Sequence, residues 1–399
     1  MKSTNLLIIT DRYPHNKDPV TSYFVYSQID ALKKYFDTIY VISLNPFIPK
    51  LFSKFSFMHP RWRKDAFAMD YSYDNVEVRF ARYFMLPFDF VKERKGELAY
   101  NVAKRIIERE KIEFDLIHAH FTWPSGYVGA KLKEKCGKPL IITGHGHDVY
   151  DLPFNDVTLN KKIRSTLNAA DCIITVSKSN YDKLMQLDIS DEKVSVIPNG
   201  YDLDLFKNIP INKARERLNL PKDKKIILSV GYLEQIKGHK YLINAMKEIV
   251  KRRTDVLCII VGNGKLRNEL EMQIKELELE DYIRLAGEKP HQKIPLWMNA
   301  CDVFVLPSLR ESFGVVQIEA MACGKPVVAT YNGGSEEIII SEDYGLLCEP
   351  ANPEELAEKI LIALDKEWDG EKILKYAERF RWENIVKEIL EVYKDVSVI

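Results

Sequence analysis

The sequence lacks several features that would place it in a familiar class. It has no excess charge of either sign, because 58 Lys and Arg residues balance 58 Asp and Glu residues. Nothing in this balance favours nucleic acid as a partner. It also has no apolar run of about 18 residues, so we expect no segment that spans a membrane. The apolar part of the N-terminal stretch is too short for a signal peptide and reads better as a buried strand.

Paired cysteines are lacking too. The six cysteines are scattered, and none forms a Cys-x-x-Cys pair. Cys172 and Cys258 fall within apolar runs, as buried thiols do. We therefore expect reduced cysteines in a cytoplasmic protein rather than a disulfide framework.

Short apolar runs alternating with longer amphipathic stretches fill most of the 399 residues. The runs are hydrophobic without alternation, which is typical of strands covered on both faces, and the stretches between them have helical spacing. This repeated strand–helix–strand pattern predicts an α/β protein with parallel sheets. The expected strands are residues 5–11, 38–44, 76–84, 115–120, 139–145, 172–177, 194–199, 225–231, 256–262, 283–287, 303–308, 326–330 and 345–350.

The chain length predicts two domains, and the two series of strands predict a parallel sheet in each. We place the N-terminal domain at 1–203 and the C-terminal domain at 204–375, with an Asn-Gly turn near the boundary. The last helical stretch, 376–396, is expected to pack back on the first domain. Ligands bind beyond the carboxyl ends of parallel strands, so loops that follow strands should line a cleft between the domains.

The segment 311–319, ESFGVVQIE, carries two glutamates eight positions apart. The pattern predicts a loop that ends at Gly314, followed by a helix over 315–323. The N-terminus of such a helix suits a phosphate group. Glu311 before that site and Glu319 within the helix could then bind hydroxyl groups on either side of the anion, as a nucleotide sugar would present them. The alternative is that both are ordinary surface carboxylates.

Histidines cluster in HAH, with His118 and His120, and in HGHD, which contains His145 and Asp148. One interpretation is a metal site, since His-x-His with Asp can ligate zinc. A second is acceptor binding and transition-state stabilisation. A third makes some of them hydrogen-bonding groups of the loops.

Residues 50–64, KLFSKFSFMHPRWRK, mix basic and aromatic side chains without an acid. Such a segment is either a solvated loop or a peripheral contact with an anionic membrane surface, the inner face of the membrane in a cytoplasmic protein.

Several motifs together resemble glycosyltransferase family 4, whose members are retaining enzymes of GT-B fold (glycosyl transferases group 1). They are PSLRESFG followed by EAMACGKPVVATYNGGSEEII, IPNGYDLDLF, SVGYLEQIKGHKYLINA and IIVGNGKLRNEL. The resemblance covers nearly the whole chain. It implies two Rossmann-like, doubly wound domains that face a cleft, an acceptor-binding domain over 1–203 and a donor-binding domain over 204–375. It implies transfer of a hexose or N-acetylhexosamine from a UDP- or GDP-sugar to a glycan or lipid-linked acceptor, in cell-surface polysaccharide or glycoconjugate synthesis. It implies no cofactor and no required metal. The sequence shows no convincing nucleophile, so front-face transfer is the expected route.

The resemblance also assigns roles to individual residues. Glu311 contacts hydroxyl groups of the transferred sugar, Glu319 binds the ribose diol, and Lys237 neutralises the departing diphosphate. The implied catalytic residues are His145, Lys237 and Glu311. The implied donor-binding residues are Tyr232, Lys237, Gly262, Gly264, Arg310, Glu311, Phe313, Gly314, Val315 and Glu319. The implied acceptor-side residues are Thr21, Ser22, His118, His120, His145 and Asp148.

The chain departs from the family pattern at Tyr232, where relatives usually carry an arginine that partners the lysine on the diphosphate. Tyrosine donates one hydrogen bond but brings no charge. Arg310 and Arg12 are candidates for the missing charge. A second departure is PVTSYF (19–24), which replaces a glycine-rich turn.

Three other activities stay open at this stage. A nucleotide-sugar epimerase shares the two-domain architecture, a metal-dependent hydrolase would use the His-x-His pairs, and a degenerate sugar-nucleotide-binding protein would have lost catalysis.

Overall fold

The computed structural model describes residues 4–16, 22–47, 68–85 and 93–396. The predicted contributions of Thr21 and of the basic, aromatic segment 50–64 lie outside these residues. The chain divides into two compact units, one of Met1–Pro198 with Glu383–Ile399 and the other of Asn199–Trp382.

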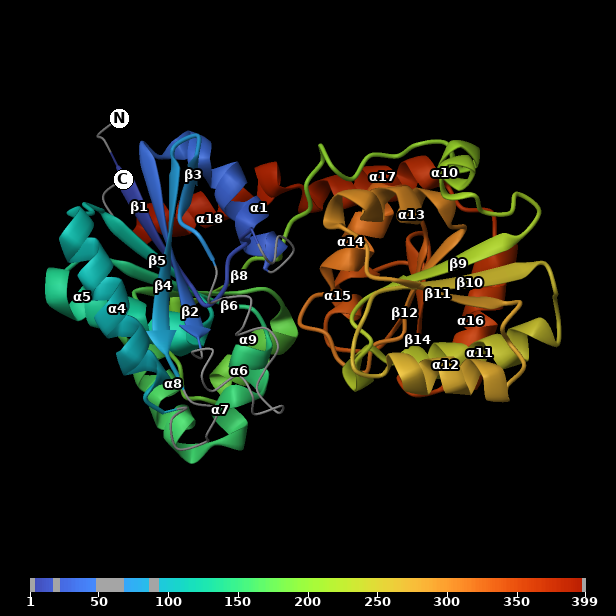
Figure 1. The fold of residues 1–399 in the computed structure, drawn as a ribbon, viewed down its shortest axis with the longest axis horizontal. Coiled ribbons are helices and arrows are strands. Elements are labelled where there is room, and N and C mark those ends of the chain that lie inside the picture. Colours follow the sequence, from blue (N-terminus) through green and yellow to red (C-terminus); the bar gives the residue numbers. More distant parts are fainter. Residues whose placement is uncertain (1–3, 17–21, 48–67, 86–92, 397–399) are drawn as a thin grey trace. The chain divides into compact units, whose positions relative to one another are not determined.

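An eight-stranded sheet forms the first unit, in the order β3-β4-β2-β1-β5-β6-β7-β8 (Figure 1). All neighbouring pairs are parallel except β3 and β4. The chain order reverses between β1 and β5, and open parallel sheets bind ligands outside the carboxyl ends of the strands at such a reversal. The strands are β1 (Asn5–Thr10), β2 (Thr38–Phe47), β3 (Tyr71–Tyr73), β4 (Val76–Phe84), β5 (Leu116–His120), β6 (Leu140–Gly144), β7 (Cys172–Thr175) and β8 (Val194–Val196).

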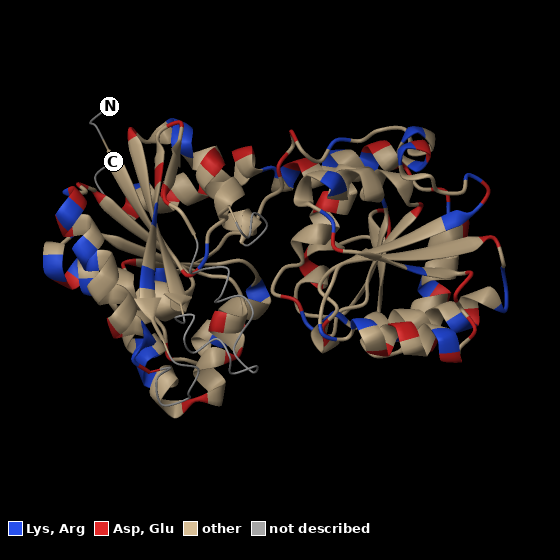
Figure 2. Cartoon of the chain, in the orientation of Figure 1, with Lys and Arg blue, Asp and Glu red and all other residues tan. Residues whose placement is uncertain are grey.

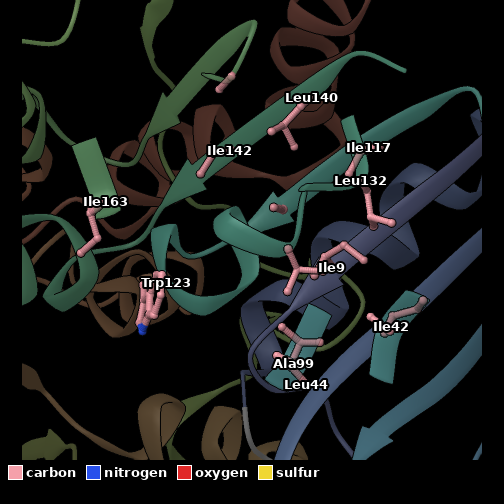
Figure 3. Close-up of a cluster of buried hydrophobic side chains, with 14 of the residues drawn as sticks. Ile9, Ile42, Leu44, Ala99, Ile117, Trp123, Leu132, Leu140, Ile142 and Ile163 are labelled. Atoms are coloured by element: carbon pink, nitrogen blue, oxygen red, sulfur yellow. The ribbon is translucent and has the colours of Figure 1, made fainter. Parts of the chain in front are cut away.

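Helices cover both faces of this sheet. On one face, residues of α4, α5 and α8 form a core with the strands, and Figure 3 shows Leu132 and Ile163 from these helices together with Ile9, Ile117 and Ile142 from the sheet. Because the sheet is buried on both faces, its strands appear in the sequence as unbroken apolar runs. The helices are α1 (Tyr23–Leu32), α4 (Lys95–Glu110), α5 (Tyr127–Cys136), α6 (His147–Tyr150), α7 (Leu152–Asn155), α8 (Val157–Ala169), α9 (Lys178–Met185) and α18 (Trp382–Val396), with short turns η1 (Lys33–Tyr35), η3 (Thr122–Gly126) and η4 (Asp191–Lys193).

The second unit holds a six-stranded parallel sheet in the order β11-β10-β9-β12-β13-β14. Here the chain order reverses between β9 and β12, which is the ligand-binding position of a doubly wound sheet. Apolar residues of α11, α12 and α16 pack on the strands as one continuous core. The strands are β9 (Lys225–Val230), β10 (Val256–Val261), β11 (Ile283–Gly287), β12 (Val303–Leu306), β13 (Val327–Thr330) and β14 (Gly345–Cys348). The helices are α10 (Ile211–Leu218), α11 (His239–Val250), α12 (Arg267–Glu276), α13 (Ile294–Ala300), α14 (Val315–Ala322), α15 (Ser335–Ile338), α16 (Pro353–Asp365) and α17 (Gly370–Ala377), with turns η5 (Gln235–Lys237), η6 (His291–Lys293) and η7 (Glu378–Phe380).

Two features differ from the sequence patterns. The three-residue strand β3 pairs antiparallel with β4 across a turn in which Asp74 has a φ of 47°, and a strand this short has no readable apolar period. The C-terminal stretch contains a break, so that α17 belongs to the second unit and α18, from Glu383 onward, to the first.

Positive and negative side chains are interspersed on the helices of both units (Figure 2), in line with the zero formal net charge. Within the described part of the chain, no helix is long and apolar enough to cross a membrane.

Two loops at the reversal of the second sheet touch through Gly238. This residue has a φ of 65°, and a Cβ on it would lie 1.9 Å from the carbonyl oxygen of Pro307, which follows β12. Only glycine combines this conformation with so close an approach. The contact sets the loop after β9 against the loop after β12.

We predict that Gly238→Ala destabilises the second unit much more than Gly137→Ala destabilises the first. Gly137 has nearly the same φ, 67°, but a Cβ there meets no atom within 4 Å. Both variants should therefore lose about 1–2 kcal/mol to left-handed strain, and Gly238→Ala should lose a further ~1–3 kcal/mol to overpacking. Urea unfolding of the two variants measures the difference, and equal losses would contradict it.

Candidate active site

The loops after β9 and β12 join at the carboxyl edge of the second sheet. The Leu309 amide donates a hydrogen bond to the Ile236 carbonyl oxygen at 2.8 Å. Beside it, Lys237 Nζ lies 2.6 Å from Glu311 Oε1. The side chains of Lys237 and Glu311 are 25% and 10% exposed, so the ion pair is largely shielded from solvent. The structure thus brings together two residues that lie 74 positions apart in the sequence, with three helix–strand repeats between them.

Glu311 is held in place by its surroundings. The hydroxyl of Ser308 donates to Glu311 Oε1 at 2.7 Å, and the Glu311 amide donates to the Asn332 carbonyl oxygen at 2.9 Å. Asn332 is itself fixed, because its side chain donates to Ser335 Oγ and accepts from the amides of Gly334 and Ser335. The carboxylate therefore points in a set direction, ready to accept hydrogen bonds.

Helix α14 begins directly after Gly314, whose φ of 83° turns the chain into the helix. The first N–H groups of a helix have no intrahelical acceptor, and the helix dipole adds positive potential there. Glu319 lies in the same helix with its side chain 8% exposed, and its Oε1 is 3.3 Å from His291 Nε2. Glu311 and Glu319 thus flank the N-terminus of α14, as the sequence predicts.

The sequence does not identify three residues that contribute to this edge of the sheet. His291 lies in η6, just past β11, and Ser308 and Asn332 orient Glu311. The rule that ligand-binding residues follow parallel strands would have found His291. Ser308 and Asn332 are recognisable only from their hydrogen bonds.

At Gly262 and Gly264, contacts within the protein explain why the residue is glycine. A Cβ on Gly262 would lie 1.8 Å from the Gly231 carbonyl oxygen, and one on Gly264 would lie 2.5 Å from that of Leu233. The close approach seen here is between neighbouring loops of the protein, and contact of these glycines with a nucleotide stays a prediction.

The remaining donor-side residues differ in accessibility. Phe313 is only 3% exposed and its ring packs against Phe380, so its side chain belongs to the core and its expected contact with the donor does not fit this burial. Tyr232 is 52% exposed after β9. Arg310 is half-buried between Leu309 and Glu311.

In the first unit, His118 and His120 lie within β5 rather than beyond it. Because side chains alternate along a strand, positions two apart share a face, and the two rings stack with centroids 4.4 Å apart. Both residues are fully buried. His118 Nδ1 bonds Tyr393 Oη of α18 at 2.6 Å, and Nε2 bonds Thr143 Oγ1 at 2.7 Å. With both nitrogens engaged, His118 has an internal role, which corrects its expected contact with the acceptor.

His145 follows β6 directly and is 8% exposed. Its Nε2 lies 2.9 Å from His120 Nδ1. Burial lowers the pKa of all three histidines, that of His120 to about 3, and neighbouring imidazoles lower the pKa values of His118 and His145 further. The three rings are therefore neutral near pH 7.

Asp148 is a positioning group in this structure. Its buried carboxylate accepts hydrogen bonds from the amides of Thr122, His145 and Gly146 at 2.8, 3.1 and 2.9 Å. Burial raises the pKa of the Asp148 carboxyl group, and these amides oppose the rise. The carboxylate thus ties the turn that carries His145 to the start of η3, and the expected direct contact with an acceptor does not fit its burial.

Two aromatic rings flank His145. The centroids of Phe24 and Phe121 lie 4.8 and 4.9 Å from that of His145. Phe121 has a φ of 75°, a strained conformation for a bulky residue. Neither ring has a sequence pattern that would identify it. Ser22 precedes α1 with a φ of 48°, and its side chain caps no amide of the helix.

Among the described residues, no three His, Cys, Asp or Glu side chains are arranged to hold a metal ion. The histidines bond to one another, to Tyr393 and to Thr143 instead of converging on one point. The interpretation of HAH and HGHD as a metal site therefore has no geometric support.

Comparisons with known proteins agree with this architecture. The family model described as Glycosyltransferase Family 4 matches residues 54–205, and the one described as Glycosyl transferases group 1 matches residues 210–381. An uncharacterized glycosyltransferase of Methanocaldococcus jannaschii is 36% identical over 75% of this chain and 80% of its own length. A D-inositol 3-phosphate glycosyltransferase of Thermobispora bispora is 28% identical over 71% of each chain.

Solved structures share the whole fold. Sucrose-phosphate synthase from Thermosynechococcus elongatus has a TM-score of 0.80 at 24% identity and covers 98% of both chains. HepE of Anabaena, in complex with UDP and glucose, has a TM-score of 0.73 at 25% identity and covers 98% of this chain and 100% of its own. The chain is therefore a glycosyltransferase of GT-B fold, and it belongs to glycosyltransferase family 4, glycosyl transferases group 1.

Proposed function

We propose that this enzyme moves a hexose or N-acetylhexosamine from a UDP- or GDP-sugar, with retention of configuration, to a glycan or lipid-linked acceptor. The reaction would serve the synthesis of a cell-surface polysaccharide or glycoconjugate. The observation that carries the proposal is the placement of Glu311 and Glu319 on either side of the N-terminus of α14, with Lys237 against Glu311.

This arrangement matches the chemistry of a nucleotide sugar from end to end. The free amides at Gly314 and Val315 and the Lys237 ammonium suit a diphosphate. Glu311 is positioned to accept hydrogen bonds from sugar hydroxyls, and Glu319 from the ribose diol. HepE, at 25% identity, supports the class of donor because its complexes hold UDP and glucose or UDP-glucose.

In the proposed mechanism the leaving phosphate oxygen takes the acceptor's proton on the same face from which the diphosphate departs. No protein nucleophile is then needed. The enzyme contributes positioning and stabilisation of the charge that develops on the diphosphate. Lys237 and the α14 amides supply that charge stabilisation, and neutral His145 orients the acceptor through a hydrogen bond.

The acceptor would bind at the carboxyl edge of the first sheet. Ser22, Phe24, Phe121 and His145 surround this edge, and their aromatic rings suit the apolar face of a sugar. D-inositol 3-phosphate glycosyltransferases among the relatives suggest a hydroxyl-rich acceptor as an alternative to a glycan.

We predict that incubation with a panel of UDP- and GDP-sugars gives slow nucleoside diphosphate release with one donor. A suitable acceptor should accelerate the release, and ¹H NMR of the product should show the donor's anomeric configuration. An inverted product would overturn retention. New sugar nucleotide without release would instead indicate an epimerase, and tight binding without any product would indicate a degenerate binder.

The charge opposite the diphosphate should come from Lys237 and, in place of an arginine at Tyr232, from Arg310. We expect Lys237→Ala to lower kcat/KM by about 10²–10³-fold, as loss of one transition-state contact does, and Arg310→Ala to lower it by at least ~10-fold. Lys240→Ala, an exposed lysine in the next helix, is the matched control and should change little. If kcat/KM is unchanged in Arg310→Ala, Arg12 becomes the candidate for the second positive charge. Arg12→Ala then tests that role by the same measurement.

A peripheral membrane contact through residues 50–64 remains a prediction from the sequence. We expect the enzyme to float with liposomes that contain anionic lipid and to stay behind with neutral ones. Replacing the lysines and arginines of this segment with glutamine should abolish flotation. If the parent enzyme does not float, the segment is a solvated loop.

A further inference from the structure

The hydrogen bond between His120 and His145 restricts where both rings carry their protons. The two rings lie nearly in one plane, at 15°, with centroids 5.2 Å apart and with His120 Nδ1 2.9 Å from His145 Nε2. This is the geometry of an edge-to-edge N–H···N bond. Each neutral imidazole carries one proton, so one proton lies in the bond and a second must occupy one of the two outer nitrogens.

The outer nitrogens are His120 Nε2 and His145 Nδ1. Both are buried, and neither has a hydrogen-bond partner. A buried N–H group without an acceptor is rarer in proteins than a bare acceptor. His120 is 0% exposed, with one face of its ring covered by His118, whereas His145 is 8% exposed. The second proton therefore costs less on His145 Nδ1, in the ring of the partly exposed residue, than on His120 Nε2, in the ring of the residue that has no exposure.

We infer that His120 is a positioning residue that holds His145 in its Nδ1–H tautomer, so that His145 offers a hydrogen-bond donor to an oxygen of the bound substrate. The role at the substrate rests on the proposed function. The tautomer is a property of the protein alone.

Neighbouring elements keep this pair in position. His118 stacks on His120 and is itself held by Tyr393 of α18 and by Thr143 of β6. The carboxylate of Asp148 in α6 accepts from the His145 amide and fixes the turn. Among the described residues, the titratable groups around His145 are therefore His118 and His120 on β5, Asp148 on α6 and, behind His118, Tyr393 on α18.

As a consequence, His145 acts as a neutral donor and not as a general base. A base would have to give up the Nδ1 proton or protonate a nitrogen already engaged with His120. Burial and His120 lower the pKa of His145 well below 6.5. The rate of sugar transfer should therefore hold as the pH falls through 6.5 and decline only at lower pH.

The direct test is long-range ¹H–¹⁵N NMR of the full chain with ¹⁵N-labelled histidine rings. His145→Gln and His120→Asn spectra assign the two residues. We expect both rings to carry a proton on Nδ1 and none on Nε2. A proton on His145 Nε2, or a His145 ring that averages between tautomers, would overturn the inference whether or not the protein transfers sugar.

Two variants separate positioning from packing. His120→Phe keeps an aromatic ring on His118 but removes the donor, whereas the amide of His120→Asn restores a donor near Nδ1. We expect kcat to fall at least ~10-fold in His120→Phe, with an acid limb at higher pH than in the parent, and to recover most of that loss in His120→Asn. His147→Gln, at the exposed neighbour that pairs with Asp151, should match the parent.

Equal losses in His120→Phe and His120→Asn, with unchanged pH profiles, would show that His120 only fills space and would overturn the inference. An inactive protein whose His145 carries the Nδ1 proton would count against the proposed function and for the tautomer.

Discussion

The carboxyl edge of the second sheet depends on one contact, the ion pair between Lys237 Nζ and Glu311 Oε1 at 2.6 Å. In the ligand-free protein each charge is the other's counterion, which reduces the cost of holding both in a partly buried position. A diphosphate carries more negative charge than one carboxylate. Under the proposed function, its arrival would draw Lys237 toward phosphate and leave Glu311, still held by Ser308, to accept hydrogen bonds from the sugar.

The backbone makes this contact possible. Lys237 reaches Glu311 because the loops after β9 and β12 approach closely where the order of the parallel strands reverses, and Gly238 lets one loop lie against Pro307. The glycines at 262 and 264 do the same between the loops after β9 and β10. Several glycines that resemble ligand-binding motifs are thus requirements of loop-to-loop packing, which brings the functional groups to one edge.

The sequence predicts the fold well because most strands show a strong apolar pattern. Strands buried on both faces read as apolar runs, so both sheets are identifiable, whereas β3 is too short to show a pattern and pairs antiparallel through a tight turn. The positions of Glu311 and Glu319 around the start of α14 also follow from the local pattern. The partners of Glu311 do not, because Lys237 and Asn332 come from separate loops.

Burial separates the predicted site residues that stay accessible from those that the fold encloses. His118, Phe313 and Asp148 have residue types suited to binding, but the sheets and their loops enclose them, and each satisfies internal partners. A motif identifies residues near a site, and only packing decides which of them face a ligand. The histidines of β5 illustrate this point, because they lie behind His145 and, under our inference, determine its tautomer.

The central claim is that a diphosphate binds between Lys237 and the start of α14. A crystal structure of the enzyme soaked with UDP, and in parallel with GDP, tests it most directly. We expect phosphate oxygens within hydrogen-bond distance of the amides at Gly314 and Val315 and of Lys237 Nζ, with Glu319 on the ribose hydroxyls. A nucleotide bound elsewhere, or bound here with Lys237 still paired to Glu311 and Glu319 away from the ribose, would contradict it.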